Sequence, residues 1–354
     1  MAGVNVLSTM AFPDEWLERV RTVSPRLTVT QYTAATAAEV PAALWRETDV
    51  LYTGSALPDP SQAPRLRWVQ LDTSGVDHVQ TTGLWATGVE FTTLNGVAPS
   101  NMAEFAVMMM LAFGHRLRLM VELQGRREWP TFQERWDRFM PSELRGATVG
   151  IVGYGSIGRE IGRLAHALGM RVLAMRRSGT GAGAGAGAGA GLGEGATARE
   201  TYRIPSLAQT TNPEPDRVFL PAQLAEMLPE CDYVVLIVPY TAATRHMIDE
   251  RALRAMKPSA VLVNLARGGV VDETVLVRAL REGWIAGAAL DVFEEEPLPA
   301  DHPLWSMPNV LISPHVAGLT PHYHERVMGV FAANLQRFLD DQPLLNRVDR
   351  ERGY

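Results

Sequence analysis

The stretch that decides the fold is Ala147-Thr-Val-Gly-Ile-Val-Gly-Tyr-Gly-Ser-Ile-Gly158. Residues 147–152 form a short apolar run, which predicts a buried strand. Apolar residues with the spacing of one helix face follow the glycines: Ile157, Ile161, Leu164, Ala165 and Leu168. Gly169 can end this helix, and a second apolar strand is predicted at 171–175. Strand, glycine-rich turn, helix and strand together make a βαβ unit of a parallel sheet.

Gly153, Gly155 and Gly158 have the G-x-G-x-x-G spacing of a dinucleotide-binding turn. The first glycine permits the tight turn, the second lets a pyrophosphate approach the backbone, and the third lets helix and strand pack closely. The backbone of Ser156 and Ile157 then offers N–H groups to phosphate at the start of the helix. A glycine-rich turn without a ligand could have the same letters, but the flanking strand and helix favour the dinucleotide site.

The end of the second strand indicates which dinucleotide is bound. An NAD-selective fold usually has an acidic residue about 20 residues beyond the glycines, where it binds the ribose 2′-OH. Arg176 and Arg177 stand at that point instead. Guanidinium groups pair well with a 2′-phosphate, so NADP is the expected cofactor. NAD is the alternative if the two arginines are only a solvated strand end.

The rest of the chain predicts two parallel sheets. Beyond the glycine turn, four more strands are expected at 233–238, 260–264, 285–291 and 310–313, giving a doubly wound sheet of six strands. A helix at 272–282, ended by Gly283, lies between two of them. Before the turn, strands are expected at 5–10, 27–32, 50–54, 67–72 and 89–94, alternating with helix-compatible stretches. The fold class is therefore α/β.

A long apolar helix is expected between the two sheets. Asn101, with Glu104 three residues later, predicts its N-cap, and residues 105–113 predict a helix buried in the core. This apolar run is far shorter than the roughly 20 residues needed to cross a bilayer.

Composition limits the class of protein. The chain has 354 residues, whereas a single domain usually has about 100–200, so two domains are expected. The net charge of -6 and the absence of a basic block argue against nucleic acid as a partner. Cys231 is the single cysteine, and the N-terminus does not resemble a secretion signal, so we expect a cytoplasmic protein with no membrane partner. The spacing of histidines and carboxylates does not predict a metal site.

A Gly-Ala tract at 181–191 interrupts the second domain. Glycine and alanine bury too little surface to offset the entropy of ordering them, so 179–215 is expected to be a flexible surface insertion. A silk-like strand is the alternative, but a single short tract would have no strands to stack on.

Three segments follow predicted strands, at the carboxyl ends where open α/β sheets bind ligands. They are Asn264-Leu-Ala-Arg-Gly-Gly-Val-Val-Asp-Glu273, Leu290-Asp-Val-Phe-Glu-Glu-Glu-Pro297 and Ser313-Pro-His-Val-Ala-Gly318. In this order they resemble the D-isomer-specific 2-hydroxyacid dehydrogenase family, which includes glyoxylate/hydroxypyruvate reductases and phosphoglycerate dehydrogenases. The resemblance covers nearly the whole chain except the insertion.

The resemblance implies a role for each of three residues: Arg267 as the substrate-binding arginine, Glu296 as the orienting carboxylate, and His315 as the acid/base. It also implies cofactor contacts at Pro239, Thr244, Ala266, Asp291 and Gly318, and substrate contacts at Ser74, Gly75 and Val76. Glu294 and Glu295 are expected to face solvent, and His246 and His302 to be ordinary loop histidines. Each of the three catalytic candidates taken singly could be structural, but the three segments together favour catalysis.

Physical chemistry supports these roles. Reducing a 2-oxo acid requires a cation for the carboxylate and carbonyl, and a proton donor for the developing alkoxide. Arginine offers a planar, permanently charged fork, and histidine titrates near neutral pH. A glutamate beside the histidine would favour the imidazolium form that reduction needs. Arg267, Glu296 and His315 supply these three groups.

The resemblance also implies the domain arrangement. A flavodoxin-like substrate domain would comprise 1–98 and 319–354, and a Rossmann domain, 99–318, would be inserted into it. The stretch 125–141 carries Trp129, Phe132, Trp136 and Phe139 and resembles an arm that reaches a partner subunit. Exposed aromatic side chains favour burial, so a homodimer is expected.

The expected reaction is NADPH-dependent reduction of glyoxylate, hydroxypyruvate or a related 2-oxo acid to the D-2-hydroxy acid. Its stereochemistry follows from the resemblance alone. Two alternatives stay open on the same fold: a dinucleotide-sensing binding protein like the C-terminal binding protein corepressors, and a catalytically weak subunit of another enzyme.

Overall fold

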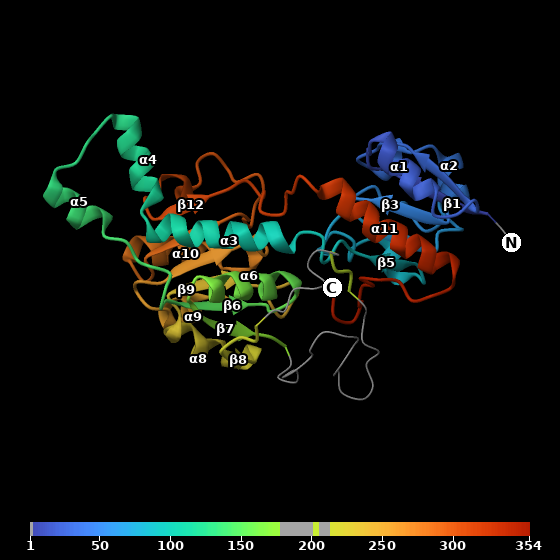
Figure 1. The fold of residues 1–354 in the computed structure, drawn as a ribbon. Helices are drawn as coiled ribbons and strands as arrows, with labels where there is room; N and C mark the ends of the chain where they lie inside the picture. The colour runs from blue at the N-terminus through green and yellow to red at the C-terminus, as the bar shows by residue number, and fades with distance from the viewer. Residues whose placement is uncertain (1–2, 178–200, 205–212) are drawn as a thin grey trace. The chain divides into compact units, whose positions relative to one another are not determined.

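The computed structural model describes residues 3–177, 201–204 and 213–354 (Figure 1). They divide into two compact units: one of 3–97, 201–204 and 320–354, the other of 98–177 and 213–319. The second unit therefore lies between two parts of the first in the sequence. The predicted Gly-Ala tract at 181–191 lies outside the described residues. No helix in the described part of the chain is long and apolar enough to cross a membrane.

The first unit is built on a five-stranded parallel sheet of order β2-β1-β3-β4-β5. Its strands are β1 (Val4–Ser8), β2 (Leu27–Gln31), β3 (Val50–Thr53), β4 (Trp68–Leu71) and β5 (Glu90–Thr92). Its helices are α1 (Asp14–Arg21), α2 (Ala42–Glu47) and α11 (Tyr323–Leu339), with short 3-10 turns at Ala37–Glu39 and Gly83–Ala86. The predicted strands and the flavodoxin-like order are confirmed.

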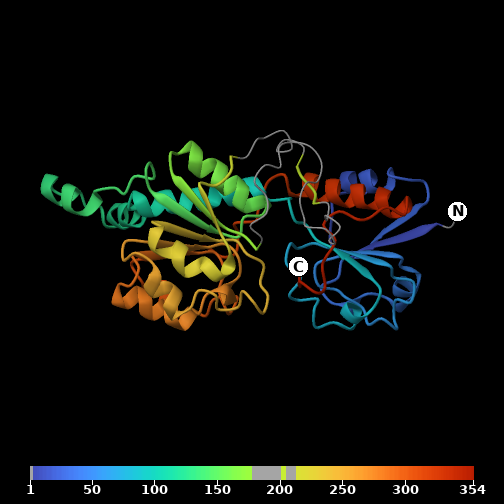
Figure 2. The ribbon, with the colours of Figure 1, turned by 90° about the horizontal axis from the view of Figure 1, so that it is seen from below.

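The core of this unit lies on both faces of its sheet. On one face Tyr52 and Trp68 pack against Phe331 of α11. Figure 2 shows α11, in red, beside α1 on this side of the sheet. On the other face Leu51 and Val69 pack with the buried Trp45 of α2. The C-terminal helix thus covers one face of a sheet formed by the first third of the chain.

The second unit has a seven-stranded parallel sheet of order β12-β11-β10-β9-β6-β7-β8. Its strands are β6 (Thr148–Val152), β7 (Arg171–Met175), β8 (Arg217–Phe219), β9 (Tyr233–Leu236), β10 (Val261–Asn264), β11 (Gly287–Leu290) and β12 (Val310–Ile312). Its helices are α3 (Pro99–Gly114), α4 (Leu117–Arg126), α5 (Phe132–Phe139), α6 (Ser156–Ala167), α8 (Leu224–Met227), α9 (Glu250–Ala255) and α10 (Glu273–Glu282). Four 3-10 turns complete it: Pro221–Gln223, Leu228–Glu230, Gly268–Val270 and Pro303–Ser306.

This sheet is the predicted doubly wound Rossmann sheet, with one strand more than expected. The chain runs outward from β6 to β8 on one side and from β9 to β12 on the other, so its direction reverses between β6 and β9. Ligands of such sheets bind at the carboxyl ends of the strands beside this reversal. The extra strand, β8, has three residues and a partly exposed pattern, so its sequence lacks the apolar run that marks the others.

Two expectations about α3 were wrong. The helix begins at Pro99 with Ala98 as its N-cap, so Asn101 lies inside the first turn and does not cap it. Proline at the first helical position already has the right φ and lacks an N–H that would need a partner. The run 105–113 is not wholly buried either, because the side chains of Met108 and Leu111 are exposed.

Part of the predicted flexible insertion is packed on the first unit. The backbone N–H of Tyr202 donates to the side-chain carbonyl of Asn346, at 2.9 Å, and Ile204 is buried. Gly96 has a φ of +85°, and a Cβ there would lie 2.2 Å from the carbonyl oxygen of Tyr202. Residues 201–204 therefore belong to the body of this unit.

Candidate active site

The glycine-rich turn fits a dinucleotide phosphate. Gly153 has a φ of +105°, and a Cβ there would lie 2.6 Å from the Ile237 carbonyl oxygen. A Cβ on Gly158 would lie 2.2 Å from the carbonyl oxygen of Gly153. In contrast, a Cβ on Gly155 would meet nothing within 4 Å, so the space in front of the turn is open. Helix α6 begins behind it at Ser156 without a side-chain cap, as anion binding requires.

Two buried polar atoms next to this turn have no hydrogen-bond partner among the described residues: Arg176 Nε and the Tyr154 hydroxyl. Arg176 follows β7, and its backbone N–H donates to the Phe219 carbonyl at 3.0 Å. Arg177 is exposed beside it. Burial raises the pKa of Tyr154 to about 12, so its hydroxyl keeps its proton at neutral pH. Buried donors without partners are uncommon, and an anionic ligand would satisfy them.

Arg267 stands in a loop that the buried Asn264 holds at the carboxyl end of β10. The Asn264 amide donates to the Arg267 carbonyl at 3.0 Å and accepts from the N–H of the buried Ala266 at 3.1 Å. Gly268 is required next, because a Cβ there would lie 1.8 Å from the carbonyl carbon of Phe293. The loop bearing Arg267 is therefore in direct contact with the loop bearing Glu296.

Glu296 and His315 form a close pair. His315 Nδ1 lies 2.7 Å from Glu296 Oε2, while Glu296 Oε1 accepts from the Phe293 N–H at 2.9 Å. A carboxylate only accepts hydrogen bonds, so this contact places a proton on Nδ1 of the imidazole. Nε2 is then the ring atom that can exchange a proton with a ligand. Both side chains are partly exposed, as groups that meet a substrate must be.

Asp291 holds the loop that carries His315. Its carboxylate is buried and accepts from the hydroxyl of Ser313 at 2.6 Å, and from the N–H groups of Val316 and Ala317 at 2.9 Å each. His315 itself has a φ of +55°, a conformation that needs support in a residue other than glycine. Asn101 adds to this support, since its amide donates to the Ala317 carbonyl at 2.8 Å.

Other predicted cofactor residues lie in the turns at the same edge of the sheet. The Thr244 hydroxyl donates to the Pro239 carbonyl at 2.7 Å and accepts from the Thr241 N–H at 2.8 Å, which closes the turn after β9. Gly318 is exposed directly after the Asp291-anchored turn. The sequence did not predict the supporting roles of Asn264 and Asn101. A buried asparagine at a strand end was the available signal for Asn264.

The predicted substrate loop, Ser74–Val76, belongs to the first unit. Ser74 is exposed, Val76 is buried, and the Thr73 hydroxyl donates to the Gly75 carbonyl at 2.7 Å. Asp72, just before this loop, accepts hydrogen bonds from the hydroxyls of Tyr52 and Tyr323. The base of the loop is thus joined to α11, a link between residues far apart in sequence.

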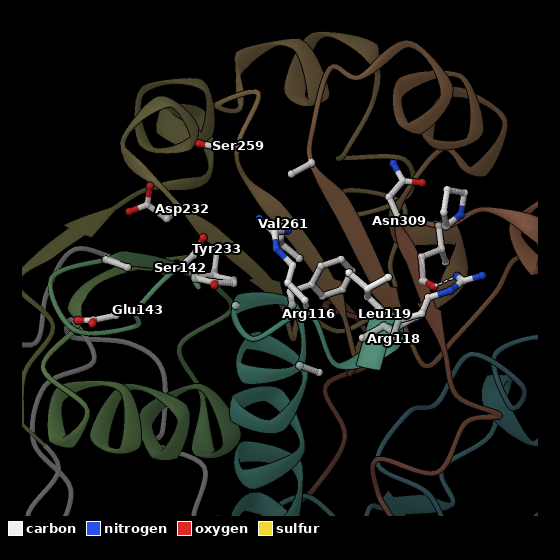
Figure 3. A pocket seen from close by; sticks show the side chains of 18 of the residues that line it. Arg116, Arg118, Leu119, Ser142, Glu143, Asp232, Tyr233, Ser259, Val261 and Asn309 are labelled. Carbon is white, nitrogen blue, oxygen red and sulfur yellow. Dashed lines mark hydrogen bonds between the residues drawn. The ribbon is translucent and has the colours of Figure 1, made fainter. Parts of the chain in front are cut away.

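A separate cavity of about 740 Å³ lies at the amino ends of the strands of the second sheet (Figure 3). Tyr233 and Val261, at the amino ends of β9 and β10, line it, whereas the triad follows the carboxyl ends of β10, β11 and β12. Arg116 and Arg118, at the start of α4, also line it. This cavity is therefore distinct from the candidate active site.

Comparison with known proteins gives consistent matches. A family model described as “D-isomer specific 2-hydroxyacid dehydrogenase, NAD binding domain” matches residues 107–193 and 195–317. The chain is 37% identical over 291 residues to glyoxylate reductase from Thermococcus onnurineus, covering 82% of this chain and 78% of that protein. A D-isomer specific 2-hydroxyacid dehydrogenase family protein from Aeromonas salmonicida has a similar structure, with a TM-score of 0.77 and 28% identity over 99% of this chain and 100% of the other. A D-isomer specific 2-hydroxyacid dehydrogenase from Xanthobacter autotrophicus, solved with NADPH and MES, gives a TM-score of 0.77 and 25% identity over 100% of both chains.

Proposed function

Because the chain belongs to the D-isomer specific 2-hydroxyacid dehydrogenase family, we propose that it reduces glyoxylate, hydroxypyruvate or a closely related 2-oxo acid to the D-2-hydroxy acid, with NADPH. It is an NAD(P)-dependent oxidoreductase of this family. The observation that carries the proposal is the 2.7 Å contact between His315 and Glu296, on loops anchored beside Arg267. The relative from Thermococcus onnurineus is named a glyoxylate reductase, which favours a small 2-oxo acid.

Each residue of the triad has one task in the proposed reaction. When bound, the reduced nicotinamide would be the source of the hydride that the carbonyl carbon of the substrate accepts. Arg267 binds the 2-oxo acid through its guanidinium and polarises the carbonyl. His315, with its Nδ1 proton directed at Glu296, donates a proton from Nε2 to the oxygen that becomes the hydroxyl. Glu296 keeps the imidazole oriented and stabilises its protonated form.

The chain's own residues would hold the cofactor and the substrate carboxylate. The open turn at Gly155 and the uncapped start of α6 would bind the pyrophosphate. Arg176 and Arg177 would bind the 2′-phosphate of NADPH, and the buried Arg176 Nε without a partner supports this preference over NADH. The backbone of Ser74–Val76 would bind the carboxylate of the substrate.

The test is the initial rate of NADPH and of NADH oxidation with glyoxylate, hydroxypyruvate and pyruvate as separate substrates. We expect turnover with NADPH and the smallest 2-oxo acids, and loss of turnover in Arg267→Ala with cofactor binding retained. Turnover with NADH alone would contradict the NADPH preference. Cofactor binding without turnover on any substrate would contradict the reductase and favour the dinucleotide-sensing protein.

The partner that the second unit fits is a second copy of the chain. Figure 1 shows α4 and α5 standing away from the sheet of this unit. Trp129, Phe132 and Trp136 are 87%, 67% and 55% exposed. Such a run of exposed aromatic residues favours burial in a protein interface. We propose that this aromatic surface of one copy packs against the second unit of the other.

A further inference from the structure

Two histidines and two glutamates form a continuous chain of contacts next to the loop that carries Glu296. His246 Nε2 lies 2.9 Å from Glu294 Oε1, and His302 Nε2 lies 3.3 Å from Glu273 Oε1. The two glutamates also meet: the Glu273 N–H donates to Glu294 Oε1 at 3.4 Å, and the Glu294 N–H donates to Glu273 Oε2 at 3.3 Å. The order is therefore His246, Glu294, Glu273, His302, which we call the His–Glu chain.

The His–Glu chain joins four separate segments. His246 comes from the turn after β9, Glu273 is the first residue of α10, and Glu294 is in the loop after β11. His302 caps the 3-10 turn Pro303–Ser306, because its Nδ1 accepts from the Leu304 N–H at 3.4 Å. That contact leaves Nε2 of His302 as the donor to Glu273. The sequence predicts His246 and His302 to be ordinary loop histidines, and the structure adds that each is paired with a glutamate.

Glu273 and His246 are the firmly held members of the His–Glu chain. The Glu273 side chain is only 13% exposed, and burial is the main reason that its pKa is raised. His246 has a φ of +48°, and its N–H donates to the Gly269 carbonyl at 2.8 Å, which ties it to the loop that follows Arg267. Among the described residues, no group of three or more histidine, cysteine or acidic side chains has a geometry suited to a metal ion.

Glu294 is two residues before Glu296, on the same tight loop. The backbone of this loop is limited on one side by Gly268, where no Cβ can be accommodated, and is closed by the bond from the Phe293 N–H to Glu296 Oε1. Glu294 adds a further polar restraint on the loop, through its side chain to His246 and its backbone to Glu273. The hydrogen bonds of Glu294 therefore act on the same short backbone segment that carries Phe293 and Glu296.

We propose that Glu294, held by His246 and Glu273, is a positioning residue that places Glu296 against His315. This inference rests on the proposed reductase activity, because it assigns Glu294 a part in the same reaction. Glu294 does not contact the reacting atoms. It acts through the backbone of residues 293–296, which fixes the distance between Glu296 and His315.

The variants that test this are Glu294→Ala, Glu294→Gln and the control Glu295→Ala. Glu295 is exposed in the same acidic run, so its removal changes the same charge at nearly the same place. We expect Glu294→Ala to lower kcat by about tenfold, within the roughly 100-fold that a misplacement of about 1 Å can cost. Glu294→Gln keeps an acceptor oxygen for His246 and should retain most of the activity, as should Glu295→Ala. Equal losses in Glu294→Gln and Glu295→Ala would indicate an effect of charge alone and overturn the proposal.

A double-mutant cycle separates positioning from general damage. If Glu294 acts through Glu296, then Glu294→Ala should slow the Glu296→Gln enzyme by less than about twofold. Independent losses that multiply would overturn the proposal.

Hydrogen–deuterium exchange supplies a readout that needs no turnover. Glu294→Ala should speed exchange at the amide of Phe293, which donates to Glu296, and Glu295→Ala should not. A wild-type protein without turnover would defeat the proposed function but leave this measurement intact. Unchanged exchange in Glu294→Ala would defeat the positioning role itself.

Discussion

His315 Nδ1 lies 2.7 Å from Glu296 Oε2, across 19 residues of sequence and between two different loops. The other oxygen of the carboxylate is held by the N–H of Phe293, three residues earlier. Glu296 is thus fixed at one end by its own loop and presents the other end to the imidazole. This contact determines which ring nitrogen can serve a substrate.

Replacing Glu296 by glutamine should lower kcat/KM for 2-oxo acid reduction by about 10- to 100-fold. The amide keeps the shape but loses the charge that stabilises the imidazolium, and proton transfer by a well-placed group is worth about 100- to 10,000-fold. The dissociation constant for NADPH, measured by quenching of protein fluorescence, should stay unchanged. A variant with normal kcat/KM would remove Glu296 from the mechanism.

Replacing Asp291 by asparagine should both destabilise the protein and lower kcat for 2-oxo acid reduction. Its two oxygens accept three hydrogen bonds from the loop around His315, and an amide offers only one acceptor oxygen. Leaving a buried donor without a partner costs about 1–3 kcal/mol, which thermal unfolding would detect. Asp301→Asn, in an exposed loop of the same unit, is the control. Full activity in Asp291→Asn would mean that the loop of His315 is held in another way.

The buried Asp72, which accepts a hydrogen bond from Tyr323, should make stability depend on pH. Burial raises the pKa of Asp72, while hydrogen bonds from Tyr323 and Tyr52 oppose this rise. Since the folded pKa is above the unfolded value, the folded state binds more protons, and stability falls as pH rises from about 4 through the folded pKa. Tyr323→Phe removes the larger of the two opposing hydrogen bonds, so the pKa of Asp72 should rise further.

We therefore expect Tyr323→Phe to lose more stability at pH 7 than at pH 4, by about 1–2 kcal/mol, because a hydrogen bond to a charged group is worth about 1.5–3 kcal/mol. Urea unfolding at both pH values measures this difference. Tyr32→Phe, in the same unit but partly exposed, is the control. Equal losses at the two pH values would show that Asp72 does not carry the charge assigned to it.

Replacing Arg176 by alanine should raise the KM for NADPH by roughly tenfold and leave the KM for NADH nearly unchanged. The hydrogen bonds between an arginine and a phosphate are charge-assisted. Only NADPH carries the 2′-phosphate, so only the binding of NADPH should be weakened. Arg171→Ala is a matched control at the other end of β7, where the side chain pairs with Glu230. Similar increases for both cofactors would place Arg176 in the fold and not in the phosphate site.

Replacing Trp136 by glutamate should convert the proposed dimer to a monomer. A charge in the middle of the exposed aromatic surface of α5 would be buried without a partner in the interface. Light scattering after size-exclusion chromatography measures the mass of the wild-type and variant proteins. The polar positions of α5 already carry the acidic residues Glu134 and Asp137. Gln133→Glu adds one more acidic group at such a position and is therefore a suitable control. A wild-type monomer would contradict the proposed interface.

Much of the fold could be predicted because its signals are local. Apolar runs predicted the five strands of the first sheet and six of the seven strands of the second. The glycines of the turn predicted the Rossmann unit. Gly169 and Gly283, both with positive φ, end their helices as predicted. The predicted family is also confirmed by the family model and by the relatives. It could be predicted because three motifs in a fixed order are specific even in a single sequence.

What could not be predicted depends on contacts between distant residues. A capping pattern at Asn101 is a local signal, yet its amide reaches carbonyls 216 and 218 residues further along the chain. The resemblance implies a cofactor contact at Asp291, and only the structure shows that its carboxylate also holds the turn around His315. His246 and His302 have no pattern in the sequence that links them to Glu294 and Glu273.

The sequence by itself determined the βαβ turn and the two parallel sheets, because strand periodicity and glycine backbone requirements are properties of neighbouring residues. The three catalytic candidates followed from the resemblance of their motifs to the family and remain a prediction. Only the tertiary structure decided which side chains hold those candidates in place. Asp72 meets Tyr323 and Glu294 meets His246 because packed sheets bring loop ends together. Such hydrogen bonds need partners within about 3 Å, and sequence spacing does not specify that proximity.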